Sequence, residues 1–319
     1  MTADGETTSS SRTLIDRERL GSGVRAWSQA IFHSRAGRRF LAHRGGVLSA
    51  IYIFVLLAMA LLAPFVAPYS FETQNIDRLL QGPSAEHWFG TDALGRDVFS
   101  RVIYGARMSM AVGLLTALVS LIIGGVYGAI SGWVGGWLDS VLMRLVDILD
   151  SIPSLVLLIL VGVVFTAYQP FENPEIRALV GILLALSVVG WVSLARLVRG
   201  QVLQVREMQF VESAHAIGAP GSRILIRHIA PNILGPVVVM LTYQVPANIL
   251  FESFLSFVGL GLQPPYASWG VLANDGWRAK SDPHLIFFPG AALFVTMLAF
   301  NFFGDALRDA LDPKVARSR

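Results

Sequence analysis

Residues 108–130 read MSMAVGLLTALVSLIIGGVYGAI, a stretch without a single charged side chain. A helix needs about 20 apolar residues to cross roughly 30 Å of hydrocarbon at about 1.5 Å rise per residue. The stretch therefore predicts a membrane-spanning helix. Further spanning segments are expected in the rest of the chain, because a spanning helix needs partners to form a bundle.

Five further apolar segments qualify as spans by the same measure. Together with the first, they cover residues 47–67, 108–130, 141–168, 178–197, 232–257 and 285–304. The third segment contains Arg144, Asp147 and Asp150 near its start, so its membrane part is expected to begin close to Ser151. The pattern predicts an all-α polytopic membrane protein with six transmembrane helices.

The composition agrees with a membrane protein. The chain has 319 residues, of which 54% are hydrophobic and 15% are charged, whereas soluble domains carry about a quarter charged residues. This composition excludes disorder and argues against an ordinary soluble enzyme. The absence of cysteine excludes disulfides, thiolate nucleophiles and cysteine metal sites. The six histidines are scattered without paired-ligand spacing, so no metal site is expected.

Basic residues predict the orientation, since they are retained on the cytoplasmic side of a span. With the N-terminus inside, 18 of the 25 lysines and arginines lie in inner segments. Both termini are therefore expected to be cytoplasmic. Topology explains the basic residues, so no nucleic-acid partner is expected.

This topology divides the chain into tails, loops and a core. Residues 1–46 form a cytoplasmic tail without the apolar region of a cleaved signal peptide. Within that tail, residues 26–40 are either a basic interfacial helix or a solvated segment. Residues 68–107 form an external loop after the first span. Residues 108–304 form a five-helix core with an inner loop at 206–231 and an external loop at 259–283. Residues 305–319 form a second cytoplasmic tail.

The inner loop is predicted to hold two short helices. In the first, Phe210, Ala214 and Ile217 recur at helical spacing, and Gly218 with Pro220 ends it. The second is expected at 222–229, with Ser222 as its N-cap and Pro231 opening the next span. Such a pair either docks another protein or merely caps the bundle, and the pattern alone gives the two readings equal weight.

Several polar or conformationally special residues lie within or near the spans. Glu252 must face protein or water, because a carboxylate facing lipid costs about 2.5–3.5 kcal/mol at the centre of a span. It is either a pathway group, a latch to a neighbouring subunit, or a satisfied boundary residue. Asp147 and Asp150 are expected to pair with Arg144 at the inner interface, either as a gate anchor or as a simple ion pair.

Two further features concern the shape and packing of the spans. Pro153 and Pro246 are expected to kink helices, as gate hinges or as static bends. Gly124, Gly128 and Gly132 repeat every four residues and predict a close helix–helix contact.

The inner loop also carries a family resemblance. Glu212-Ser213-Ala214, then Gly218, then Pro231 resembles the E-A-A loop of ABC-importer permeases, with Ser213 in place of alanine. Arg227 to Asn232 is similar to the peptide-importing branch. Further stretches of that branch are matched in order, and they include Gly90-Thr91-Asp92, Gly95-Arg96-Asp97, 132–139, 252–261, Pro264-Pro265, 268–270 and 304–313. The chain is most similar to the C-type permease of oligopeptide and dipeptide importers.

The resemblance implies a fold and a set of partners. The fold would be a type I ABC-importer core preceded by one peripheral helix, in the bacterial inner membrane. The partners would be a second homologous permease, one or two ABC ATPase subunits, membrane lipid and an extracytoplasmic peptide-binding protein. ATP and magnesium would be bound by the ATPases, since the chain lacks the Gly-Lys of a Walker A loop and no cofactor is expected on it. It is therefore expected to be a non-catalytic subunit.

The resemblance also implies site residues and a substrate. The ATPase-coupling residues would be Glu212, Ser213, Ala214, Gly218, Ala219, Pro220 and Arg223. Pathway or gate candidates are Glu252, Asp147, Asp150 and Pro153, and the external motif is Gly90, Thr91, Asp92, Gly95, Arg96 and Asp97. The expected substrate is a peptide handed over by the binding protein. Nickel, glutathione or another small solute is the alternative within the family, and an ion-coupled secondary transporter is the alternative outside it.

Overall fold

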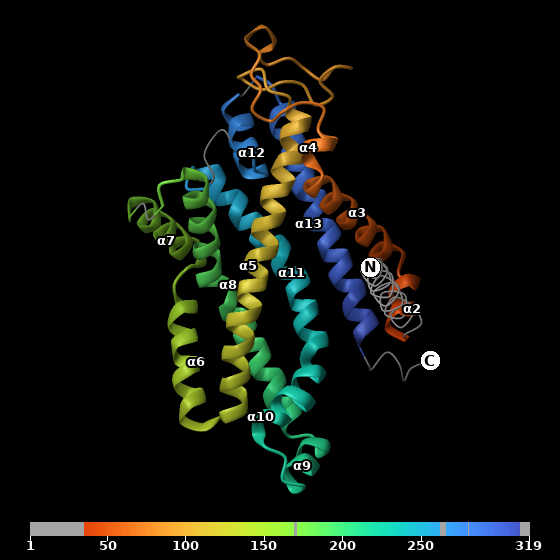
Figure 1. Cartoon of the computed structure of the whole chain (residues 1–319), viewed down its shortest axis with the longest axis vertical. Coiled ribbons are helices and arrows are strands. Elements are labelled where there is room, and N and C mark those ends of the chain that lie inside the picture. The colour runs from red at the N-terminus through yellow and green to blue at the C-terminus, as the bar shows by residue number, and fades with distance from the viewer. Residues whose placement is uncertain (1–34, 169–170, 262–265, 280, 313–319) are drawn as a thin grey trace, which may run out of the picture.

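The computed structural model describes residues 35–168, 171–261, 266–279 and 281–312. Within these ranges the chain is helical, with one isolated antiparallel bridge between Thr91 and Asp97 and no strand. The stretch of the N-terminal tail before residue 35 and the prolines at 264 and 265 lie outside the described residues. The molecule is elongated, with helices running along its long axis (Figure 1).

The helices occur in two groups along the chain. The first group comprises α2 (Arg35–Ala42), α3 (Arg44–Leu61), α4 (Ala63–Val66), the 3-10 turn η1 (Ile76–Arg78), α5 (Val98–Val134), α6 (Gly136–Ser151) and α7 (Ser154–Tyr168). The second comprises α8 (Pro174–Arg206), α9 (Gln209–Ala216), α10 (Gly221–Ile224), the π-helical turn η2 (Leu225–Ile229), α11 (Ala230–Val258), α12 (Trp269–Arg278) and α13 (His284–Leu311).

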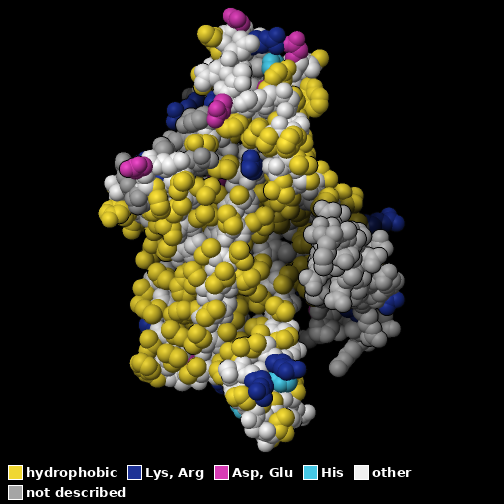
Figure 2. Space-filling model, in the orientation of Figure 1, with side chains coloured by type: hydrophobic (Ala, Val, Ile, Leu, Met, Phe, Trp, Pro, Cys, Tyr) yellow, Lys and Arg dark blue, Asp and Glu magenta, His cyan; other side chains and the backbone are white. Residues whose placement is uncertain are grey.

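Five helical stretches are long and apolar enough to cross a membrane, and the bent pair α6–α7 makes a sixth if it is counted as one span. Figure 2 shows hydrophobic side chains over the middle of the visible face, with acidic side chains toward one end and basic ones at both. The predicted all-α architecture with six spans is confirmed.

The third span is broken, and the reason is local. Helices α6 and α7 meet at an angle of 87°, and Ile152, which precedes Pro153, has extended backbone angles. Proline disfavours a helical conformation in the residue before it and lacks an N–H to continue the ladder. The kink expected at Pro153 is therefore a break between two helices.

Helices α5 and α8 form the centre of the bundle through a close backbone contact. A β-carbon added at Gly124, Gly128 or Gly132 would come within 2.3–2.8 Å of a backbone oxygen of α8. Only residues without a side chain permit this approach. The packing role predicted for this glycine stripe is confirmed.

Helix α3, the first span, lies at the side of the bundle. It packs against α13 and α5, and 17% of its most apolar window is buried, against 44% for α5 and for α8. This arrangement agrees with a peripheral helix ahead of a five-span core. Helix α5 begins at Val98, ten residues before the apolar segment read from the sequence, because Asp97 caps it there.

Candidate functional site

Helices α9 and α10 form a helical hairpin at one end of the molecule (Figure 1). Helix α9 ends where Gly218 adopts a positive φ of 80°, and the amide of Ala219 donates to the carbonyl of Ala214. A left-handed glycine of this kind closes a helix without steric cost. The stop predicted at Gly218 is therefore present.

The second helix of the hairpin differs from the prediction. Ser222 does not cap it, because α10 begins at Gly221 after Pro220. The helix also does not stop before Pro231, because the π-helical turn η2 leads directly into α11. The wider turn accommodates the missing N–H of the proline, and the Asn232 side-chain amide donates to the backbone carbonyl of His228 at 2.6 Å.

The hairpin has a packed side and an exposed side. Val211 and Ala214 of α9 pack with Ile224 and Ile229 in one apolar cluster. Phe210 and Ile217, expected on the packed side, are exposed, with Ile217 at 85%. Of the predicted apolar face, Ala214 is buried as expected, but Val211 is buried in place of Phe210 and Ile217 is exposed. The free surface is therefore more apolar than predicted.

The surface of the hairpin that faces away from the bundle combines apolar and charged side chains. Glu212, Ser213, Arg223 and Arg227 are exposed there, and Ile226 is 71% exposed. The side chains visible at this tip are rich in basic and histidine groups (Figure 2). Exposed apolar residues ringed by charge are typical of a protein-docking surface.

Helix α8 leads into the hairpin and is tied to its neighbours by three arginines. Arg196 contacts Asp150 at 2.7 Å and Asp147 at 3.0 Å, and Arg199 makes a bidentate pair with Asp139 at 2.5 and 2.6 Å. The expected pairing of Asp147 and Asp150 with Arg144 was wrong. Arg144 lies on the exposed side of α6, whereas Arg196 comes from the helix packed against it.

The third arginine, Arg206, ends α8 just before the hairpin. Its Nη1 donates to the backbone carbonyls of Gly132 and Trp133, which lie in the last turn of α5. Arg206 therefore joins the end of α8 to the end of α5 beside the hairpin. These pairs join residues some 50 to 70 positions apart, a separation that one sequence cannot reveal.

Glu252 of α11 is completely buried within the chain. Its carboxylate accepts hydrogen bonds from Ser109 of α5 at 2.9 Å and from Ser256 at 2.8 Å. The expectation that Glu252 faces protein or water is confirmed. In this conformation the carboxylate is a latch between two helices of one chain, and it does not reach an open passage.

Glu252 belongs to a buried polar seam that the sequence reading missed. The seam occupies one face of α11 at four-residue spacing and consists of Gln244, Asn248, Glu252 and Ser256. Asn248 donates to the carbonyl of Gly113 on α5, and Gln244 donates to that of Gly190 on α8. The four-residue spacing is visible in the sequence and could have identified the seam.

At the opposite end, the external motif folds into a tight turn. Asp92 Oδ1 accepts the backbone amides of Leu94 and Arg96, and Gly95 has a positive φ of 70° beside the carbonyl of Asn75. Asp97 caps α5 through the amide of Ser100 and also contacts His87 Nδ1 at 2.9 Å. Thr91 bridges Arg78 and Gln81.

Asp92 also anchors two arginines. Its Oδ2 accepts Arg96 Nε at 2.7 Å and Arg101 Nη1 at 2.5 Å, and Asp275 of α12 contacts both arginines. The sequence reading named Asp92 and Arg96. It missed Arg101 and Asp275, since nothing local relates residues 174 positions apart.

The fold and these sites define a polytopic helical membrane protein with an exposed helical hairpin at one end and an ordered turn at the other. The family model described as the binding-protein-dependent transport system inner membrane component matches residues 121–317. The model of the N-terminal transmembrane domain of oligopeptide transport permease C matches residues 32–83. The chain belongs to this family of ABC-importer permeases, and the resemblance read from its sequence is confirmed.

Relatives match most of the chain. It is 43% identical over 284 residues to the dipeptide transport system permease protein DppC of Bacillus subtilis (strain 168), covering 88% of this chain and 86% of that protein. It is 46% identical over 282 residues to the oligopeptide transport system permease protein OppC of Escherichia coli (strain K12), covering 88% and 90%. A glutathione transport system permease protein, GsiD of Shigella flexneri serotype 5b (strain 8401), is 41% identical, covering 87% and 89%.

Solved structures share the fold at low sequence identity. A chain of the MetNI methionine ABC transporter in inward-facing conformations superposes with a TM-score of 0.54 at 16% identity, covering 66% of this chain and 97% of that chain. A chain of an amino acid ABC transporter gives a TM-score of 0.51 at 16% identity, covering 67% and 95%.

Proposed function

We propose that this chain forms half of a translocation pathway for peptides delivered by an extracytoplasmic binding protein. The observation that carries the proposal is 43–46% identity to dipeptide and oligopeptide permeases over 88% of the chain. A second homologous permease supplies the other half. Two ATPase subunits or domains, which bind ATP and magnesium, close beneath the pair and drive the cycle.

The hairpin of α9 and α10 is the proposed contact with the ATPase, which places it and both termini in the cytoplasm. Its exposed apolar residues, Ile217 and Ile226, stand among charged side chains and offer a docking surface. The ties from Arg206 to the end of α5, and from Arg199 to α6, give a route from this surface into the bundle. Glu212, Ser213 and Arg223 would contact the ATPase, while Ala214, Gly218, Ala219 and Pro220 set the shape of the hairpin.

Glutathione is a second candidate cargo, favoured by the 41% identity to a glutathione permease. Glutathione is itself a short peptide, so the same pathway chemistry serves both. An uptake assay tests the proposal. The full chain is purified with its partners and reconstituted into vesicles, and ATP-dependent uptake of labelled dipeptides and glutathione is measured. Uptake that needs no ATPase subunit, or that is driven by an ion gradient, would overturn it.

A changed charge on the docking surface should uncouple ATP hydrolysis from transport. We expect Glu212→Lys and Ile217→Asp to lower peptide-stimulated ATP hydrolysis about tenfold, the size of losing a contact of roughly 1.4 kcal/mol. Both side chains are exposed, so the fold should survive. Glu172→Lys, an exposed substitution in the turn just before α8, is the matched control and should leave hydrolysis unchanged. Undiminished hydrolysis in the two hairpin variants would count against the proposed contact.

A further inference from the structure

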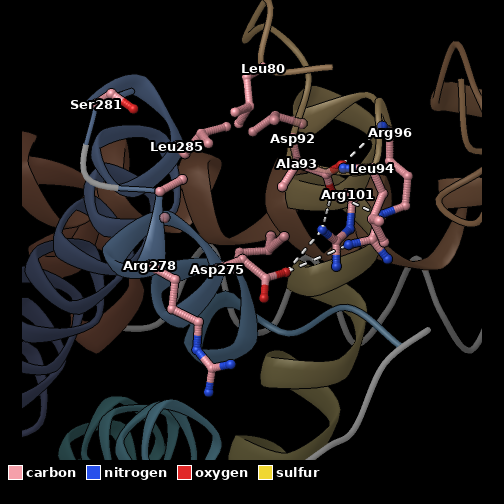
Figure 3. Close-up of a pocket in the computed structure, with 14 residues that line it drawn as sticks. Leu80, Asp92, Ala93, Leu94, Arg96, Arg101, Asp275, Arg278, Ser281 and Leu285 are labelled. Atoms are coloured by element: carbon pink, nitrogen blue, oxygen red, sulfur yellow. Dashed lines mark hydrogen bonds and ion pairs between the residues drawn. The ribbon is translucent and has the colours of Figure 1, made fainter. Parts of the chain in front are cut away.

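A cavity of about 730 Å³ opens at the end of the molecule opposite the hairpin. The turn at 90–97, the start of α5, helix α12 and the start of α13 enclose it, and Figure 3 shows the residues that line it. Leu80, Leu272 and Leu285 contribute apolar walls. Its volume lies in the range of sites for small organic ligands, about 300–1,000 Å³.

The wall of this cavity holds more positive than negative charge. Arg96 and Arg101 contact two carboxylates, Asp92 and Asp275. Arg278 also lines the cavity, but it points away from both carboxylates in Figure 3 and donates to Asn274, so its charge has no carboxylate partner among the described residues. Asp92 is saturated, since it accepts two backbone amides and both buried arginines. The surplus favours an anionic ligand.

Arg101 is the buried cation of this cluster and is only partly satisfied. Its side chain is fully buried, and its Nη1 contacts Asp92 and Asp275. Its Nε and Nη2 have no hydrogen-bond partner among the described residues. These two nitrogens form the edge of a guanidinium that binds a carboxylate with two parallel hydrogen bonds. A buried donor without a partner is unfavourable, so Arg101 favours a further acceptor. Neither nitrogen is exposed in this conformation, so a ligand that takes the place of Asp275 first contacts Nη1.

Asp275 is the more loosely held of the two carboxylates. It lies 3.2 Å from Arg101 and 3.7 Å from Arg96, against 2.5 and 2.7 Å for Asp92, and its side chain is 35% exposed. Figure 3 shows its carboxylate beside the two arginines, joined to them by dashed lines. An entering carboxylate can therefore displace Asp275 from the arginines while Asp92 keeps them in place.

We propose that this cavity receives the C-terminal carboxylate of a short peptide, with Arg96 and Arg101 as its anchors and Asp275 as a resident competitor. The leucine walls take the apolar side chains of the peptide. The inference rests on the proposed function for its choice of ligand, and it adds a peptide site on the permease itself at the end away from the ATPase.

Removing the charge of Asp275 should raise the affinity for a peptide with a free carboxylate. A misfolded variant would lose affinity, so it cannot produce this result. The test uses the full chain in lipid nanodiscs and titrates the dipeptide leucyl-leucine, its C-terminal amide and its N-acetylated form. We expect Asp275→Asn to tighten binding of the free acid about fivefold, the upper range for a partly exposed charge pair. The amide should bind weakly to both forms. Asp77→Asn, an exposed substitution in η1 at the same end, is the matched control and should change nothing.

Several results would overturn the proposal. They are equal affinity for the acid and the amide, an affinity unchanged by Asp275→Asn, or an effect of Asp275→Asn confined to capture of the binding protein. Peptide uptake by the reconstituted transporter reports separately on the proposed function. Uptake without any preference of this chain for a free carboxylate would leave that function standing and remove the site.

Discussion

Glu252 shows how one buried carboxylate can hold two spans together. Its oxygens accept from Ser109 on α5 and Ser256 on α11 in a region closed to solvent. Polar groups enclosed in a membrane bundle are stable only when each finds a partner. Glu252 therefore acts through its hydrogen bonds, and a side chain of similar size that accepts no hydrogen bond would not replace it.

Two substitutions at Glu252 separate hydrogen bonding from volume. Glu252→Leu leaves the hydroxyls of two serines without their acceptor and should lower the free energy of unfolding by about 2–6 kcal/mol, at roughly 1–3 kcal/mol for each unsatisfied hydroxyl. Glu252→Gln keeps an oxygen acceptor and should cost less than half as much. Thermal unfolding in detergent, followed by circular dichroism, measures both. Equal losses would show that the latch is not made of hydrogen bonds.

The ion pair of Asp139 and Arg199 is the tightest link between α6 and α8. Both oxygens of Asp139 are engaged, and Ser131 of α5 donates to one of them. We expect Asp139→Asn to cost about 1.5–3 kcal/mol, the contribution of hydrogen bonds to a charged group. The reversed pair, Asp139→Arg with Arg199→Asp, should restore part of that loss. Absence of any rescue, measured by the same unfolding assay, would contradict a specific pair.

At the scale of elements, the glycine stripe of α5 fixes its distance from α8. A β-carbon at Gly128 would stand 2.3 Å from the carbonyl oxygen of Ala195, and a backbone oxygen cannot move aside. Gly128→Ala should therefore lower the free energy of unfolding of the bundle by about 1–3 kcal/mol, the typical cost of overpacking. Gly125→Ala, whose nearest neighbour is a leucine methyl at 3.9 Å, is the matched control and should be neutral. Equal yields of folded protein for the two variants would refute the close contact.

The positions of the helices could be predicted from the sequence better than the faces that they bury. The spans followed from runs of apolar residues, and the stop of α9 followed from Gly218, since both signals are local. The register of α9 could not be predicted, because Phe210 and Val211 are both apolar and only the packing against Ile224 selects Val211. The continuous helix through Pro231 was also hidden, since a π-helical turn has no clear sequence signal.

At the scale of the whole molecule, the two ends have different characters. One end offers the exposed hairpin, and the other holds the charged cavity around Arg101 and Asp275 (Figure 3). The order of the spans could be read from the sequence. The long-range pairs could not, because Arg101 with Asp275, and Asp139 with Arg199, meet only after the bundle forms. The proposed function depends most on the hairpin as the place where an ATPase binds.

Site-directed crosslinking tests that claim most directly. The chain has no cysteine, so Ile217→Cys introduces a single reactive site on the exposed side of the hairpin. In sealed cells it should resist a membrane-impermeant maleimide, and in the assembled transporter it should crosslink to the ATPase subunit. Val211→Cys, 1% exposed, should do neither. Labelling of Ile217→Cys from outside, or its failure to crosslink with the ATPase in an active transporter, would contradict the account.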